Sequence, residues 1–308
     1  MGYLLAALIG GLLAFNSIAT PHQAARVAEK ALRREYPGAQ VHVDIQGRSG
    51  FPVLHGKFHS VRVEMAHLSL RGFPLQPSPP APLPSSTSTS TPPAAATPPE
   101  DTGQPAPSQT PPVAEPQPVA TEQDGHTERI EIVLRDFTWN NLHVDFADFV
   151  LNDISYDWGK LKGGGHLSIV NCGPALATMT IPASALQDLL VKKLKDISDP
   201  QLSLKDGLAQ VTGKKTVLFM PLSFVFTGRP EAHNGNEIWI VDPKLKTGPD
   251  DVVPLPVEKI VGHLNPIYVF DRQGRWPFRV DITNIDARDD MLNLSADLKF
   301  KGTVLPSP

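Results

Sequence analysis

The chain has 308 residues, of which 41% are hydrophobic and 19% are charged, a composition typical of a globular protein. Its net charge of −4 argues against a nucleic-acid-binding protein, because such proteins usually carry a basic excess. The single cysteine, Cys172, excludes an intramolecular disulfide framework and any multi-cysteine zinc or iron–sulfur site.

An apolar run, Tyr3–Phe15, opens the chain and is followed by the small residues Ser17 and Ala19. The run is shorter than the roughly 20 residues of a transmembrane helix but has the length of a signal-peptide core. No lysine or arginine precedes it, which departs from the usual export signal. We interpret residues 1–19 as a signal peptide or membrane anchor, which predicts an extracytoplasmic or periplasmic location in the cell envelope. A buried helix and an anchor of reversed orientation are the alternatives.

A helix is predicted from Thr20, which can cap it, with Pro21 at its first position and Gln23 at the capping-box spacing. Pro37-Gly38 ends it. The segment from His22 to Leu75 carries eight cations and four anions. Such a basic segment beside an apolar leader is suited to an anionic membrane surface, and a solvated basic helix is the alternative.

Strand patterns follow the helix. Apolar and polar residues alternate in two segments before residue 76 and two after residue 121, with these apolar members: Val41, Val43, Ile45; Val61, Val63, Met65; Ile130, Ile132, Leu134; Leu142, Val144, Phe146. Between them, residues 76–121 hold 15 of the chain's 32 prolines. This stretch is too poor in large apolar groups to offset its ordering entropy. We therefore predict one domain, 20–308, interrupted by a disordered insertion at 76–121, with an interdomain linker as the alternative.

The second half predicts a helix from near Ser184, two hairpins and a closing strand pair. The helix carries the apolar stripe Leu186, Leu189, Leu190, Leu194 and Ile197. Asp206-Gly207 and Asn234-Gly235 predict hairpin turns, and the stretch Thr216–Thr227 between them predicts a strand apolar on both faces. A short helix is expected over Pro256–Leu264. The last hairpin is predicted to turn at Arg288–Asp290.

These elements predict an α+β fold in which a long, curled, mainly antiparallel sheet wraps one or two amphipathic helices. The helices are few for so much apolar sheet surface. Either the sheet folds onto itself, or it curls and leaves an apolar groove.

Motifs of catalysis are missing from the sequence. It contains no G-x-S-x-G, no H-E-x-x-H, no P-loop and no complete G-x-G-x-x-G. His55 and His59 lie four apart, but Gly56 separates them and no third ligand is near in sequence. Cys172 is interpreted as a half-buried structural residue. We therefore expect a protein that is not an enzyme and that has no metal site and no cofactor.

Five segments carry a resemblance to a known family: Gly56–Val63, Ile181–Leu190, Leu204–Gly213, Ile282–Ala287 and Leu292–Ala296. Together they resemble the LmeA-like phospholipid-binding family of bacterial envelope proteins. The resemblance implies a tubular lipid-binding fold, in which a curled sheet wraps a helix around an apolar groove. It supplies no catalytic residues, and the proline-rich insertion departs from the family pattern.

The expected function is non-catalytic binding of a phospholipid or similar amphiphile. The expected partners include a membrane surface and exclude nucleic acid. The candidate lipid contacts come from apolar pattern alone, and ordinary core packing is their alternative interpretation: Leu186, Leu189, Leu190, Leu218, Met220, Leu222, Phe224, Phe226, Val257 and Ile260. A structural or adaptor protein using the proline-rich segment as a spacer is the second hypothesis. A hydrolase with residues scattered in sequence is the third.

Overall fold

The computed structural model describes residues 20–47, 56–70, 124–159, 169–194, 197–217, 220–247, 262, 264–271 and 276–302. The predicted leader, the predicted insertion and nearly all of the predicted helix at Pro256–Leu264 lie outside these residues. Residues 1–78 and 123–308 group into one compact unit, to which all the described residues belong.

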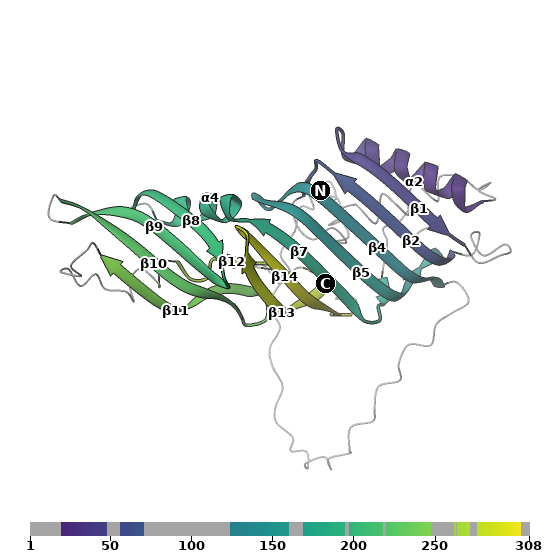
Figure 1. Ribbon diagram of the computed structural model, residues 1–308. Helices are drawn as coiled ribbons and strands as arrows, with labels where there is room; N and C mark the ends of the chain where they lie inside the picture. Colours follow the sequence, from purple (N-terminus) through teal and green to yellow (C-terminus); the bar gives the residue numbers. More distant parts are fainter. Residues whose placement is uncertain are drawn as a thin grey trace, which may run out of the picture. The chain divides into compact units, whose positions relative to one another are not determined.

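A nine-stranded sheet forms the larger part of this unit (Figure 1). Its main path runs in the order β1 (Gln40–Gln46), β2 (Lys57–Ala66), β4 (Asp124–Trp139), β5 (Leu142–Asp157), β7 (Ala175–Pro182), β14 (Met291–Phe300) and β13 (Phe278–Arg288). The short strands β3 (Ser69–Leu70) and β6 (Ile169–Asn171) pair with β4 and β5. Only β2 and β3 run parallel to their partner, β4. Parallel neighbours require a long return connection, and the chain between residues 70 and 124 supplies it.

A second sheet of five strands has the order β12 (Tyr268–Val269), β11 (Glu237–Thr247), β10 (Met220–His233), β9 (Leu208–Val217) and β8 (Ser198–Lys205). Backbone hydrogen bonds join it to β13: the Ile282 N–H donates to the Gly235 carbonyl at 2.7 Å, and the Gly207 N–H donates to the Ala287 carbonyl at 2.9 Å. The strands thus form two sheets that meet at β13, where the sequence predicted one long sheet.

Both hairpin predictions are confirmed, and one strand prediction is wrong. Asp206-Gly207 and Asn234-Gly235 form their turns with positive φ at all four residues. The stretch Thr216–Thr227 is not one strand, because Val217 ends β9 and pairs with Met220, the first residue of the antiparallel strand β10. A continuous apolar run carries no turn signal, so its alternation could not reveal the reversal.

Two α-helices lie within the described residues. Thr20 caps α2 (Pro21–Glu35), as predicted: its hydroxyl accepts the Gln23 N–H at 3.3 Å. α4 (Ala183–Lys193) follows β7 and ends earlier than its apolar stripe suggested, so Ile197 lies beyond it. Neither helix combines the length and apolar content needed to cross a membrane.

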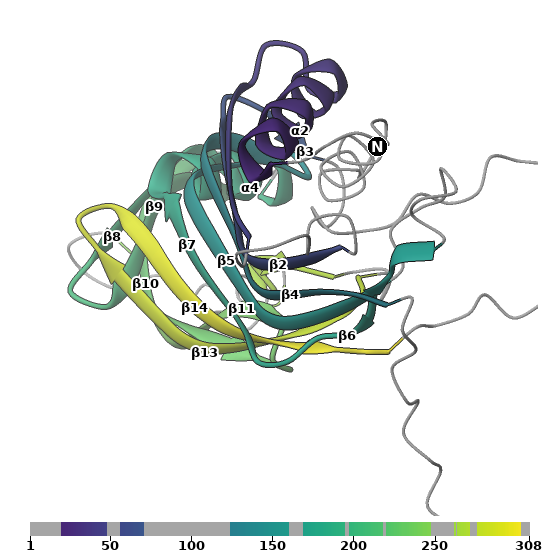
Figure 2. The ribbon, with the colours of Figure 1, turned by 90° about the vertical axis from the view of Figure 1, so that its right-hand side faces the viewer.

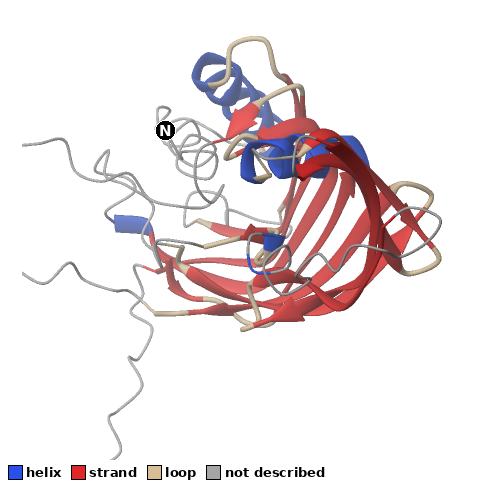
Figure 3. Cartoon of the chain, turned by 90° about the vertical axis from the view of Figure 1, so that its left-hand side faces the viewer, coloured by secondary structure: helices blue, strands red, loops and turns tan. Residues whose placement is uncertain are grey.

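The nine-stranded sheet curls into a half-barrel, visible in Figures 2 and 3. Alternate residues along its strands point to the concave side and are buried there; in β1 the alternation is perfect. A mostly β structure with a curled, mainly antiparallel sheet and two helices agrees with the predicted α+β class.

Candidate functional site

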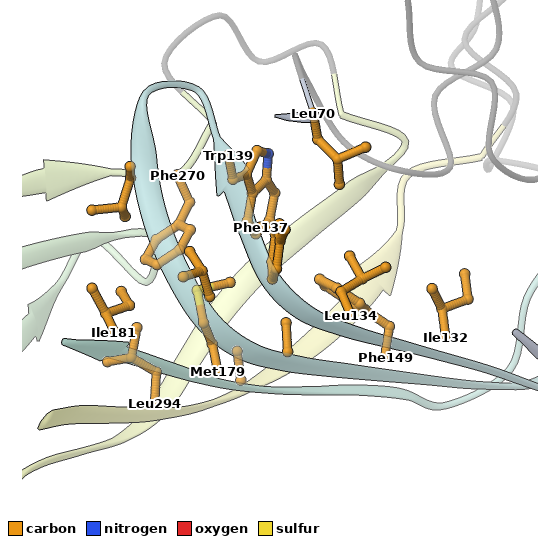
Figure 4. Close-up of a cluster of buried hydrophobic side chains, with 14 of the residues drawn as sticks. Leu70, Ile132, Leu134, Phe137, Trp139, Phe149, Met179, Ile181, Phe270 and Leu294 are labelled. Atoms are coloured by element: carbon orange, nitrogen blue, oxygen red, sulfur yellow. The ribbon is translucent and has the colours of Figure 1, made fainter. Parts of the chain in front are cut away.

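An apolar cavity lies on the concave side of the curled sheet. Its cavity volume is about 30 Å³, within a wider space of about 350 Å³ that includes open solvent. Strands β4, β5, β7, β13 and β14 and the segment that joins β12 to β13 contribute its lining: Trp139, Phe149, Ala177, Thr178, Met179, Phe270, Trp276, Val280, Ile282, Leu294, Ala296 and Leu298. Figure 4 shows several of these side chains gathered over the sheet.

The lining is apolar because strand alternation sends one set of side chains inward. In β14, Leu294, Ala296 and Leu298 line the cavity, whereas Ser295 and Asp297 between them are half-exposed. Among the described residues of the lining, Thr178 is the only polar one and none has an ionisable side chain. An apolar cavity of this kind excludes water and accepts apolar ligands.

Four aromatic rings form one wall of the cavity. The indoles of Trp139 and Trp276 stack with their centroids 5.0 Å apart and their planes at 12°. Phe149 and Phe270 meet the Trp139 ring edge-on, at centroid distances of 6.0 and 6.1 Å. Trp139 and Phe149 lie on neighbouring strands, whereas Phe270 and Trp276 come from the segment after β12. The wall therefore depends on how that segment is held.

Asn265 holds the chain just before β12, which leads into this segment, against β11. Its side-chain amide donates to the Ile240 carbonyl and accepts the Ile240 N–H, both at 2.8 Å, as a neighbouring strand would. Two backbone bonds continue the attachment: the Ile267 N–H donates to the Ile238 carbonyl at 2.7 Å, and the Phe270 N–H to the Asn236 carbonyl at 3.0 Å.

Asp271 holds the other end of the segment. Its carboxylate accepts the Trp276 N–H at 3.3 Å and pairs with the Lys301 ammonium at 3.0 Å. Lys301 follows β14, so this ion pair ties the segment to the end of that strand.

Five of the predicted lipid contacts have described side chains, and none of the five lines the cavity. Leu186, Leu190, Phe224 and Phe226 are buried in the hydrophobic core, and Leu189 packs partly buried against it. Met220 and Leu222 lie on β10, but their side chains are not among those described. Leu218, Val257 and Ile260 lie outside the described residues. Lipid contact at these positions stays a prediction.

Sequence reasoning missed the aromatic wall. Trp139 and Trp276 lie far apart in the sequence, and neither was placed in an alternating strand pattern. The tryptophan at the end of the β4 pattern, two residues after Phe137, was the available signal, because that spacing puts both side chains on the buried face.

The structure also describes Cys172 and His59, two residues that the sequence singled out. Cys172 is half-buried, and burial together with the nearby Asp153 raises the pKa of its thiol to about 11. His59 contacts Glu128, with its Nδ1 2.6 Å from the Glu128 Oε2. Within the described ranges, no three His, Cys, Asp or Glu side chains come together as a metal site would require.

Comparisons with family models, with curated proteins and with solved structures gave no match to this chain.

Proposed function

We propose that this protein binds one acyl chain of a phospholipid, or of a similar amphiphile, in the apolar cavity and performs no chemistry on it. The observation that carries the proposal is the lining: of the twelve described residues in it, eleven are apolar and none is ionisable. Burial of hydrocarbon is the one strong interaction that such a surface offers a ligand.

The size of the cavity indicates how much of the ligand enters it. The cavity volume of about 30 Å³ is far below the roughly 300–1,000 Å³ of ligand pockets. It has room for one or two water-sized groups, so an acyl chain must displace side chains of the lining to enter. We propose that one acyl chain enters as the lining opens, with the headgroup remaining at the mouth.

The energetics favour a ligand that stays in contact with a membrane. Each methylene that becomes buried contributes about 0.8 kcal/mol, less the cost of displacing side chains from the lining. Association itself costs about 4–15 kcal/mol, so the surplus is modest. A modest surplus suits a protein that exchanges lipid with a bilayer, which fits the envelope location predicted from residues 1–19 and the resemblance to LmeA-like proteins.

Native mass spectrometry of the full chain, purified gently from a lipid-containing host, tests the proposal. We expect about one phospholipid per chain, identified by solvent extraction. Ala296→Phe should fill the cavity and reduce occupancy at least tenfold. Ala232→Phe is the matched control, since Ala232 is exposed on β10 and does not line the cavity.

Equal occupancy in both variants would place the lipid elsewhere and contradict the proposal. A wild-type chain that stays bare after incubation with phospholipid vesicles would also contradict it. The bare result would favour the adaptor hypothesis, in which the proline-rich segment acts as a spacer.

A further inference from the structure

We propose that the outward face of α2 is a docking surface for anionic phospholipid bilayers. Arg26, Lys30 and Arg34 form this basic stripe, and all three side chains are exposed. The inference does not depend on the cavity, so either proposal can fail without the other.

Helix geometry places the stripe opposite the packed side of α2. Residues four apart advance by about 40° around the helix and 6 Å along it, so the three cations span about 80° and 12 Å. The buried residues Ala24, Ala25, Ala28 and Leu32 lie on the other side and face the protein. Arg26, Lys30 and Arg34 therefore present their charges to one plane of solvent.

Of the three other charged groups of α2, two are turned toward β1, and Glu35 is exposed at the carboxyl end of the helix. The Glu29 carboxylate accepts the Val43 N–H at 3.0 Å and contacts the His42 ring at 3.1 Å. The Arg33 guanidinium donates to the Val41 carbonyl at 3.0 Å. These contacts cover the free edge of β1, along which α2 lies in Figure 1. They also remove the nearest carboxylate, Glu29, from the stripe.

The stripe is not neutralised, in contrast to most arginines of the sheets. On the described strands, the arginines with a carboxylate within 4 Å are Arg62, Arg129, Arg229, Arg279 and Arg288. On α2 itself, Arg33 lies 3.8 Å from Glu29. Among the described residues, no carboxylate pairs with Arg26, Lys30 or Arg34. Interaction with the helix dipole accounts for Arg34, which lies in the last turn. It does not account for Arg26 and Lys30, which are too far from the carboxyl end.

A bilayer is the partner that best fits these charges. A flat anionic surface meets all three cations at once, and each contributes about fivefold to binding. The apolar run Tyr3–Phe15 ends six residues before Pro21, a distance of about 20 Å at most. A leader held in the membrane would keep α2 within reach of the lipid headgroups.

Flotation of the full chain with vesicles tests the docking surface. The vesicles consist of phosphatidylcholine alone or with about a third phosphatidylglycerol. We expect the phosphatidylglycerol-dependent part of binding to fall about a hundredfold in the variant Arg26→Gln, Lys30→Gln, Arg34→Gln. It should also weaken as salt rises from about 50 to about 300 mM.

Matched variants separate the face from the net charge. The control Lys214→Gln, Lys244→Gln, Lys246→Gln removes the same charge from exposed strand positions and should bind as the wild type does. The variant Arg26→Lys, Arg34→Lys keeps the charge and should also bind. Equal losses in the two glutamine variants would overturn the proposal, as would retention on heparin with no preference for phosphatidylglycerol vesicles.

If the leader alone anchors the chain to both kinds of vesicle, flotation cannot distinguish them. A second readout then reports on α2 itself. An environment-sensitive dye on His22→Cys, in a Cys172→Ser background, reports directly on the exposed side of α2. Its emission should shift to the blue on phosphatidylglycerol vesicles and not on phosphatidylcholine. The same emission on both would overturn the proposal.

Discussion

The stacked indoles of Trp139 and Trp276 join two parts of the chain that are remote in sequence, the end of β4 and the segment before β13. Both rings are buried and both line the apolar cavity. Because a bound acyl chain would touch this pair, the protein carries its own reporter of the proposed ligand.

A phospholipid brominated in the middle of one acyl chain should quench the emission of Trp139 and Trp276. Bromine quenches only at contact distance, so the effect should vanish in Trp139→Phe, Trp276→Phe. It should persist in Trp158→Phe, Trp239→Phe, whose substituted rings are not in the lining. Quenching that follows Trp158 and Trp239 instead would show that the chain binds elsewhere.

Gly125 lies against the ring of Tyr156, and a larger residue there should destabilise the protein. A Cβ at Gly125 would stand 2.2 Å from the Tyr156 Cε2, and this ring is buried. We expect Gly125→Ala to lower the free energy of unfolding by about 2 kcal/mol, measured by urea denaturation. Gly262→Ala is the control, because a Cβ there would meet no atom within 4 Å. A loss of the same size in both variants would contradict the steric explanation.

The strands could be predicted from sequence because burial on one face imposes a period of two. β1 alternates perfectly between exposed and buried residues, and the turns at Asp206-Gly207 and Asn234-Gly235 use residues that tolerate positive φ. Each of these signals is local, so a single segment of sequence contains it.

The cavity could not be predicted, because it depends on contacts between distant segments. The Asn265 amide substitutes for a strand beside Ile240, and Asp271 meets Lys301 across 30 residues. No residue near Asn265 or Asp271 in the sequence indicates which residues their side chains bind. For the same reason, the apolar stripe of α4 indicated burial correctly but could not distinguish core from cavity.

Asp148 should destabilise the folded protein at neutral pH. Its Oδ1 is buried and receives no hydrogen bond from a described group. Burial, and then the nearby Glu131, raise the pKa of this carboxyl above its ordinary 3.8. The folded state therefore binds the proton more readily, and its stability falls as pH rises through the raised pKa. We expect Asp148→Asn to gain about 0.5–1 kcal/mol at pH near 7 and nothing near pH 3.

The exposed Asp188→Asn serves as the control for this gain and should change stability little at either pH. Thermal unfolding across that range checks both variants. A gain for Asp148→Asn that persists in acid would assign the effect to packing instead of charge.

Asp281 should show the opposite pH dependence. The hydrogen bond from Lys299, and then that from Arg279, lower the pKa of its carboxyl. The contribution to stability is thus complete above pH 3.8 and is lost as pH falls through the lowered pKa. Asp281→Asn should lower the melting temperature slightly at neutral pH, with no loss near pH 2. An equal loss at both pH values would contradict the ion-pair explanation.

Asn265 lies just before β12, and its side chain helps to fix the position of the segment that follows β12. Asn265→Ala removes both bonds to Ile240, which should cost about 2 kcal/mol and loosen the backbone that carries Phe270. Faster hydrogen exchange at the Ile267 and Phe270 amides would report the loosening. Under the proposed function, lipid occupancy should fall as well, because the aromatic wall moves.

Asn265→Asp separates the two bonds. It keeps an acceptor for the Ile240 N–H, loses the donor, and places a carboxylate against the Ile240 carbonyl, so its exchange should be at least as fast as that of Asn265→Ala. Asn171→Ala, at an exposed position on β6, should leave exchange at Ile267 unchanged. Protection of Ile267 and Phe270 that survives both substitutions at Asn265 would show that the segment is held without the Asn265 side chain. The cavity wall would then owe its position to the backbone bonds to β11 and to the Asp271–Lys301 pair.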